Sequence, residues 1–172
     1  MQIVVGEGRG IVSAGVSESS HVPVRVGMDV SCLLTRPLTG VGYYTRYLVE
    51  ALAALDVELH LFAASARADR GALAGLGQDA LVKRWPTRLR IAMWTALEWP
   101  PLEWFTGAVD IVHGMFHLLP PSKGVPRLTT VFDLTNLRCA DTHTASSNRM
   151  HRTMLTHAAR RADGVIAISE SC

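Results

Sequence analysis

A glycine pair at the predicted start of an amphipathic helix is the first candidate in this sequence for an anion-binding site. Gly40 and Gly42 flank Val41 in the stretch LLTRPLTGVGYYTRYLVEAL, and a helical pattern of apolar residues follows at once. Backbone N–H groups at a helix N-terminus attract anions, and glycine lets a phosphate approach without a Cβ in the way. The loop has no acidic residue that would repel such an anion. A plain tight turn explains the same glycines equally well.

Strand-like and helix-like stretches alternate along the chain after residue 22. Apolar runs and period-two patterns predict strands at 22–31, 57–64, 81–85, 109–114, 127–134 and 163–169. Helical spacing of apolar residues predicts the main helices at 41–55, 87–99 and 146–162. This alternation predicts an α/β fold, a Rossmann-like and mostly parallel sheet with helices on both faces. We expect residues 1–22 to form an irregular N-terminal extension and residues 23–172 to form the domain.

The residues that directly follow the strands are the candidates for a binding site. Ligands of parallel α/β sheets bind at the carboxyl ends of the strands. The stretches at those ends are Ser31 to Gly42, His113 to Phe116, Phe132 to Thr135, and Ser169 to Glu170. The glycine loop therefore lies on the edge of the sheet where a ligand is expected.

Four motifs occur in one order at these strand ends, and together they identify a family. They are GMDVSCLLTRPLTGVGYYTRYLVEAL, WPPLEWFTGAVDIVHGMFHLLPPS, TTVFDLTNLR and HAARRADGVIAISESC. In this order the chain resembles the N-terminal half of family 4 glycosyltransferases of the GT-B fold, over roughly residues 24–172. Enzymes of this family are retaining transferases that use a nucleotide-activated sugar, and they usually need no metal for the chemistry. The resemblance implies no other cofactor.

The resemblance implies a role for each loop. Gly40, Val41 and Gly42 match the loop that faces the donor diphosphate across the interdomain cleft. Asp133 matches the acidic partner of a His-Asp pair near the transferring sugar, which makes it the catalytic candidate. The residues expected to line the cleft are Asp29, His113, Gly114, Ser169 and Glu170.

Two departures from the family pattern affect this interpretation. Phe132 stands where the family has the histidine of its His-Asp pair, and phenylalanine can neither titrate nor donate a hydrogen bond. His113 and His117 lie nearby in sequence, but nothing in the sequence brings either to the site. The family's second Rossmann-like domain, with two glutamates spaced E-x7-E, is not evident. Glu50 and Glu58 have that spacing in the wrong context, so we expect the donor-binding domain to be absent from this chain.

Composition excludes several other classes of protein. A net charge of +2 over 172 residues gives no indication of nucleic-acid binding. No apolar run approaches the ~18 residues of a membrane span. Cys32, Cys139 and Cys172 have no metal-ligand spacing, so we expect reduced thiols in the cytoplasm and no metal site.

The stretch KRWPTRLRIAMWTALEWPPLEWF combines basic residues with tryptophans. Such a helix can rest on an anionic membrane surface, which would suit a lipid-linked acceptor and peripheral contact with the inner face of the membrane. Tryptophans that simply pack on the sheet are the alternative.

The sequence thus predicts the acceptor-side domain of a glycosyltransferase that is inactive without a donor domain. Its partners would be a nucleotide-sugar donor, a glycan or lipid-linked acceptor, and a donor-binding domain that is missing here or supplied by a separate chain. A non-catalytic binding module, or one subunit of a split enzyme, is the alternative from another class. A free-standing nucleotide-binding protein is disfavoured, because the N-terminal Gly6, Gly8 and Gly10 do not open a helix and no P-loop lysine is present.

Overall fold

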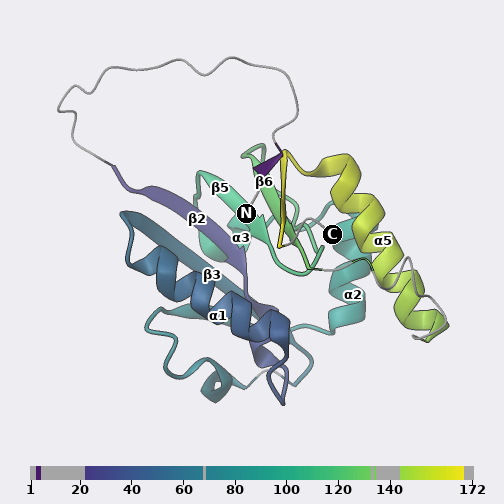
Figure 1. Cartoon of the computed structure of the whole chain (residues 1–172), viewed down its shortest axis with the longest axis horizontal. Helices are drawn as coiled ribbons and strands as arrows, with labels where there is room; N and C mark the ends of the chain where they lie inside the picture. The colour runs from purple at the N-terminus through teal and green to yellow at the C-terminus, as the bar shows by residue number, and fades with distance from the viewer. Residues whose placement is uncertain (1–2, 5–21, 68, 133, 135–143, 169–172) are drawn as a thin grey trace.

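A computed structural model describes residues 3–4, 22–67, 69–132, 134 and 144–168 of the chain. They form one seven-stranded sheet in the order β1-β7-β6-β5-β2-β3-β4 (Figure 1). The strands are β1 (Ile3–Val4), β2 (Val24–Asp29), β3 (Val57–Ser65), β4 (Ala80–Arg84), β5 (Ile111–Gly114), β6 (Arg127–Val131) and β7 (Gly164–Ala167). All pairings from β2 to β7 are parallel, so the mostly parallel sheet predicted from the sequence is confirmed.

The exception to parallel pairing lies at one edge of the sheet. Ile3–Val4, inside the segment expected to be an irregular extension, pairs antiparallel with β7. Ile3 lies opposite Ile166 and Val4 lies opposite Val165. An antiparallel edge strand on an otherwise parallel sheet is common in folds of this class.

Helices cover both faces of the sheet, as predicted. Helix α1 (Gly40–Ala53) connects β2 to β3 on one face, and α2 (Thr87–Ala92), α3 (Glu103–Thr106) and α5 (Ala145–Arg161) pack on the other. The choice of face follows from the direction in which each connection crosses the sheet. The connection through α1 runs toward the β4 edge, whereas the connections through α2, α3 and α5 run back toward β7. Right-handed crossovers in opposite directions place their helices on opposite faces. Short turns η1 (Ser31–Leu34) and η2 (Arg70–Leu73) complete the connections.

Two hydrophobic cores, one on each face, fix the sheet between its helices. Along β3, Leu61 and Ala63 point into the core beneath α1, whereas Phe62 and Ala64 point into the core beneath α2. A strand that is buried on both faces needs a continuous apolar run, which explains the sequence LFAA. Full burial of a side chain as large as Phe62 stabilises the fold by about 1.5–3 kcal/mol.

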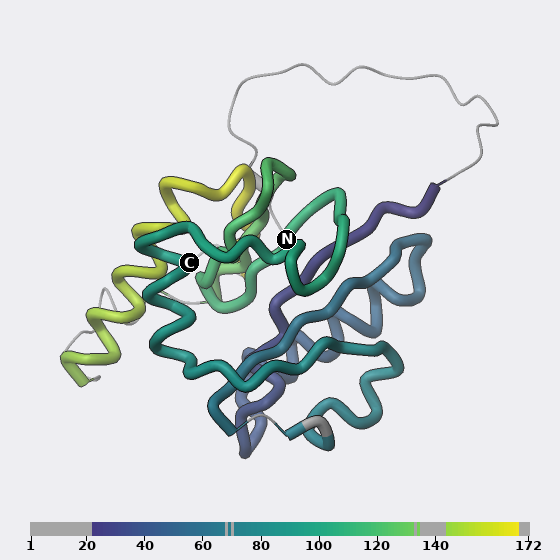
Figure 2. Tube along the Cα trace, turned by 180° about the vertical axis from the view of Figure 1, so that it is seen from behind, coloured from purple at the N-terminus to yellow at the C-terminus, as the bar shows by residue number. Residues whose placement is uncertain are grey.

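The tryptophan-rich stretch folds as α2 followed by a π-helical turn, η3 (Met93–Leu97). Trp94 is fully buried and Trp85 half-buried, and the two rings pack edge to face 6.0 Å apart. The packing interpretation is therefore correct for these two. Trp99 and Trp104 remain exposed and contact each other instead. Figure 2 shows this segment, in teal, running beside the yellow-green α5.

Candidate functional site

A cavity of about 480 Å3 opens at the carboxyl ends of β2, β3 and β5. It lies where the chain changes direction across the sheet, because the connections from β2 run toward β4 and those from β5 run toward β7. Open parallel sheets bind ligands at such a switch point. Polar lining comes from Asp29, Ser31, Cys32, Thr35, Thr39, Ser65, Thr87 and Arg90. Apolar lining comes from Leu34, Val41, Ala64, Ile91, Met115, Phe116, Leu118, Met150 and Met154.

A buried ion pair forms one wall of this cavity. Arg90 Nη1 donates hydrogen bonds of 2.7 Å to Asp29 Oδ2 and 2.6 Å to Ser31 Oγ. The Ser31 hydroxyl also donates to Asp29 and accepts a 2.8 Å hydrogen bond from the amide of Ala64. The side chains of Arg90 and Asp29 are only 3% and 5% exposed. This network holds the end of β2 against α2 and neutralises the Asp29 carboxylate, which therefore lacks the freedom expected of a general base.

The Arg90 side chain also packs on Trp94. Its Nε has no hydrogen-bond acceptor among the described residues, and its guanidinium carbon lies 5.0 Å from the ring centroid of Trp94. A guanidinium stacked on an indole ring is held in a single orientation. The guanidinium is thus a fixed part of the cavity wall, and its charge is balanced by Asp29.

The N-terminus of α1 lies at the rim of the cavity. Thr39 caps the helix by accepting from the Gly42 amide at 3.5 Å, and no acidic residue occupies the first turn. Thr39 and Val41 both line the cavity, so the positive end of the helix dipole faces it. Gly40 and Gly42 are not part of the lining. Of Gly40, Val41 and Gly42, the three residues predicted to face a diphosphate, only Val41 lines the cavity.

The two glycines of this loop have different surroundings. A Cβ added to Gly42 would lie 2.4 Å from Leu38 Cδ1, whereas one added to Gly40 would meet nothing within 4 Å. A side chain at position 42 would therefore collide with Leu38. Gly42 serves the packing of the loop on its own helix, and Gly40 is the position with open space around it.

At the end of β5, the backbone of Leu118 folds back closely against Gly114. A Cβ on Gly114 would lie 2.0 Å from the carbonyl oxygen of Leu118, so only glycine fits beneath this turn. Phe116 and His117 have positive φ angles of 55° and 61° in the same turn. Bulky residues rarely adopt this conformation, and such backbone is common at binding sites. The turn directs Phe116 into the cavity.

His113 lies at the end of β5, as predicted, but it does not line the cavity. It is buried, and its Nε2 shares a 2.8 Å hydrogen bond with the Thr130 hydroxyl. Burial lowers the pKa of His113 to about 4, so the ring is neutral at pH 7. His117 is also absent from the lining. Both histidines contact Thr130 of β6, two residues before Phe132: His113 through its ring, and His117 through a 3.1 Å hydrogen bond from its amide to the Thr130 carbonyl oxygen.

Phe132 fills the end of β6 with an aromatic contact. Its ring lies 4.9 Å from that of Tyr44 in an edge-to-face arrangement and 6.1 Å from Phe116. The neighbouring candidates Asp133, Ser169 and Glu170 lie outside the described residues. Asp29, by contrast, is the last residue of β2, and His113 is the last but one of the adjacent strand β5, where it is paired with Met28.

No group of histidine, cysteine or acidic side chains suited to hold a metal ion is found in the described part of the chain. Cys32 lines the cavity, but burial raises the pKa of its thiol to about 11, although a hydrogen bond from the thiol to Thr45 opposes this rise. The thiol therefore stays protonated at neutral pH and is a poor nucleophile or metal ligand.

Arg90 is the site residue that the sequence motifs do not point to. A signal was present, because Arg90, Ile91 and Trp94 share one face of the helix at helical spacing. A charged residue on an apolar face needs a buried partner, and Asp29 at a strand end was available. Met150 and Met154 were also missed, since their place on α5 does not reveal which cavity they reach.

Residues 38–172 match the model of Glycosyltransferase Family 4. The chain belongs to glycosyltransferase family 4. The family match begins just before the first turn of α1 and includes every strand end discussed above from His113 onward. It confirms the resemblance seen in the four motifs. No curated protein and no solved structure is significantly similar to the chain. Among the described residues of this family 4 domain, no helix has the length and apolar character needed to cross a bilayer.

Proposed function

We propose that this family 4 domain is the acceptor-side half of a glycosyltransferase that moves a sugar from a nucleoside diphosphate to an acceptor hydroxyl, with retention of anomeric configuration. The observation that carries the proposal is the cavity at the switch point of the sheet, rimmed by an acid-free first turn of α1. A leaving diphosphate carries the charge that this helix end can stabilise.

The cavity lining suits an acceptor that is partly apolar. Met115, Phe116, Met150 and Met154 offer apolar surface, and Thr35 is one of several hydroxyl groups. Hydroxyls can orient a sugar, and methionine side chains adapt to irregular apolar shapes. A glycan or a lipid-linked acceptor is the class we propose. No cofactor is part of the proposal.

The reacting centre requires groups beyond the described residues. We propose that Asp133, which follows Phe132, acts at the transferring sugar, with Gly40 and Val41 on the diphosphate side. The remaining donor contacts would come from a second Rossmann-like domain, either in the same polypeptide or in a partner chain. Ser169 and Glu170 would lie beside that domain at the end of β7.

A non-catalytic binding module, or one subunit of a split transferase, is the second candidate. The edge-to-face contact of Phe132 with Tyr44 favours it, because an aromatic pair replaces a titratable residue at the expected reaction centre. Such a module would bind the acceptor in the cavity and leave the transfer step to another chain.

The test is turnover with a panel of nucleotide sugars, followed as release of nucleoside diphosphate. We expect no sustained turnover by residues 1–172 alone and turnover once a donor-binding domain is supplied. The anomeric configuration of the product, read by NMR, then tests retention. Turnover by this chain alone would contradict the claim that a second domain must supply the donor contacts. Acceptor binding without turnover in the two-domain complex would favour the binding module.

We also propose a cytoplasmic location with peripheral contact at the inner face of the membrane. Leu89, Leu97, Trp99 and Trp104 are exposed apolar side chains of the α2–α3 segment. Aromatic rings next to basic residues bind at the interface of anionic membranes. Co-sedimentation of Trp99→Ala with anionic vesicles, compared with the unaltered chain, tests this contact.

A further inference from the structure

A second cavity, of about 460 Å3, lies between the π-helical turn η3 and helix α5. We call it the η3–α5 cleft. Thr95 and Ala96 form one wall, and one side of α5, from Arg149 to Arg161, forms the other. The strand-end cavity instead receives Met150 and Met154 from a different side of the same helix. The two cavities are therefore separate, and the role proposed above leaves the η3–α5 cleft unexplained.

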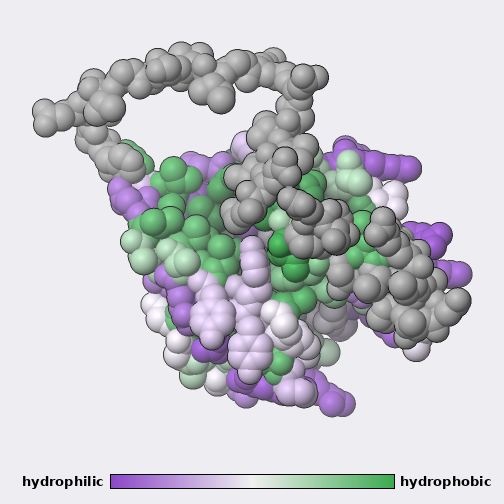
Figure 3. Space-filling view, viewed as in Figure 1, coloured by the Kyte–Doolittle hydropathy of each residue, from purple (hydrophilic) through white to green (hydrophobic). Residues whose placement is uncertain are grey.

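The wall formed by α5 is strongly basic. Arg149, Arg152, Arg160 and Arg161 all line the cleft and recur along one side of the helix. The 17 residues of α5 contain no aspartate or glutamate that could neutralise them. Hydrophilic side chains project from the margin of the molecule where α5 lies (Figures 1 and 3). Like charges that share a helix face destabilise the helix, so this arrangement has a cost that a bound anion would remove.

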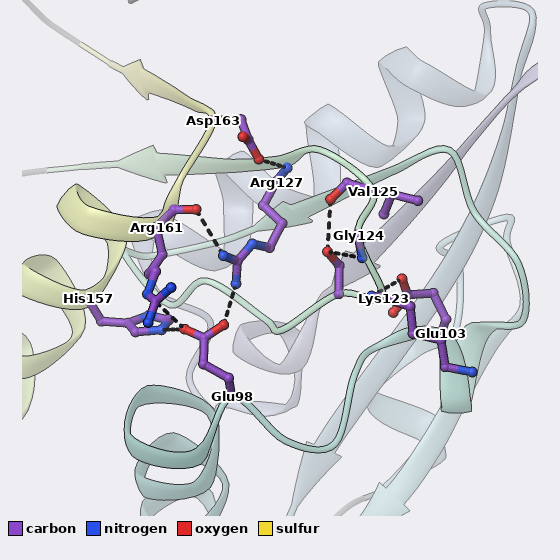
Figure 4. A network of polar contacts seen from close by, with 10 residues as sticks. Glu98, Glu103, Lys123, Gly124, Val125, Arg127, His157, Arg161 and Asp163 are labelled. Atoms are coloured by element: carbon purple, nitrogen blue, oxygen red, sulfur yellow. Dashed lines mark hydrogen bonds and ion pairs between the residues drawn. The ribbon is translucent and has the colours of Figure 1, made fainter.

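The one carboxylate in the lining is already occupied. Glu98 accepts a 2.8 Å hydrogen bond from Arg127 and another from His157, and Arg161 Nε lies 3.7 Å away (Figure 4). Burial alone would raise the pKa of the Glu98 carboxyl, but the hydrogen bonds from His157 and Arg127 hold it below its usual value. Glu98 is thus ionised and neutralised by its own partners.

Three arginines in the lining keep their charge available. Arg149, Arg152 and Arg160 are exposed, and no ion pair to any of them is found within the described ranges. Guanidinium groups bind phosphate through pairs of parallel hydrogen bonds, which gives geometric specificity as well as attraction.

The opposite wall has a backbone shape that is common at functional sites. The π-helical turn at Met93–Leu97 widens the helix where Thr95 and Ala96 meet the cleft. Glu98 then adopts a left-handed conformation with φ 51°, and its side chain reaches back to α5. Both features are uncommon in ordinary packing helices, and both occur at residues beside or in the lining of the cleft.

We propose that the η3–α5 cleft is a binding site for a phosphate-bearing ligand. Its volume falls in the range of about 300–1,000 Å3 that is usual for small-molecule sites. The phosphate belongs either to a soluble phosphorylated compound or to the headgroup of an anionic lipid. The site and its charge do not depend on glycosyl transfer, so the proposal stands or fails apart from the function proposed above.

The first test is titration of the whole chain with inorganic pyrophosphate by calorimetry at physiological salt, before and after Arg149→Gln with Arg152→Gln. We expect the double variant to weaken binding at least about tenfold, the loss of roughly one charge-assisted contact. The matched control removes two exposed charges elsewhere, Lys83→Gln with Arg84→Gln on β4. Equal weakening in the two double variants would show a general charge effect and overturn the site.

A second variant gives an effect that unfolding cannot imitate. Glu98→Gln removes the one negative charge in the lining and releases Arg161 from its ion pair, so pyrophosphate should bind more tightly, by about threefold or more. Circular dichroism melts confirm that each variant is folded. An unchanged or lower affinity in folded Glu98→Gln would put the anion elsewhere and overturn the assignment to this cleft.

A vesicle arm distinguishes the two sources of phosphate. Flotation with phosphatidylglycerol vesicles is compared with phosphatidylcholine vesicles of the same size. One outcome supports the site with a lipid headgroup as its ligand. In that outcome the unaltered chain and the β4 control bind phosphatidylglycerol vesicles, and the variant with Arg149→Gln and Arg152→Gln does not. Pyrophosphate binding without vesicle binding supports the site with a soluble ligand. Absence of both kinds of binding in the unaltered chain overturns the proposal.

Discussion

Arg90 and Asp29, 61 residues apart in sequence, form a 2.7 Å ion pair that is almost completely buried. The pair ties α2 to the end of β2, directly beside the strand-end cavity. Removing the partner of a buried charge destabilises the folded protein much more than removing the partner of an exposed charge. This contact therefore supports the site as well as the fold.

Arg90→Met should lower the free energy of unfolding by about 3–5 kcal/mol, because it leaves the Asp29 carboxylate buried without its cation. Urea unfolding followed by circular dichroism measures the loss. Arg25→Met, which breaks the exposed pair with Asp110, is the control and should barely shift the midpoint. Adding Asp29→Leu to Arg90→Met should recover part of the loss, and no recovery would mean that Arg90 stabilises the fold through its other contacts.

Gly114→Ala should destabilise the domain by about 3 kcal/mol or more, since the new Cβ would lie 2.0 Å from the Leu118 carbonyl oxygen and the backbone must move. Thermal melts of the two forms measure the effect. Gly40→Ala, where nothing lies within 4 Å of the new Cβ, is the matched control and should melt close to the unaltered chain. Similar melts for both alanine variants would refute the close approach at Gly114.

Gly42→Ala should cost about 1–3 kcal/mol, because the new Cβ would lie 2.4 Å from Leu38 Cδ1. Leu38→Ala removes the obstructing atoms, so the double variant should lose less than the sum of the two single losses. A double-mutant cycle in urea measures this coupling. Strict additivity would show that Gly42 serves something other than the contact with Leu38.

His113 should make stability depend on pH between about 6.5 and 4. Burial lowers its pKa in the folded state to about 4, so the unfolded chain binds the proton more readily. Stability is therefore complete above the unfolded value and falls as the pH drops toward 4, by roughly 3 kcal/mol over the whole window.

His113→Gln removes the titrating ring and keeps a side chain that can bond to the Thr130 hydroxyl. Urea unfolding at several pH values should give a clearly shallower slope above pH 4.5 for this variant. Below that value Glu98, whose pKa is lowered, contributes a loss in both proteins. Identical slopes above pH 4.5 would show that His113 is not the source.

The sheet and its strand ends could be predicted because local patterns carry them. Apolar runs such as LFAA in β3 reflect burial on both faces of the sheet. The strand β7 was recognisable because it follows directly after Arg160 and Arg161, the basic residues that mark the end of α5. Parallel topology then places Asp29 and the end of β5 on one edge. The glycine loop was placed correctly at the start of α1, although Gly42 packs on Leu38 instead of opening toward a ligand.

Contacts that depend on how helices approach the sheet could not be read from the sequence. The pairing of Arg90 with Asp29 requires the exact distance between α2 and β2, which no periodicity encodes. The π-helical turn at Met93–Leu97 follows α2 directly, where the sequence predicts a regular helix. The η3–α5 cleft depends on that widened turn and escaped notice for the same reason.

Helix α5 contributes to both cavities, with Met150 and Met154 in the strand-end cavity and Arg149 and Arg152 in the η3–α5 cleft. A rigid helix cannot shift or rotate without changing the shape of both. A ligand that moves α5 when it binds in one cavity would therefore change the affinity of the other cavity for its own ligand. Such coupling is reciprocal, so the factor by which one ligand alters the affinity of the second equals the factor in the reverse direction.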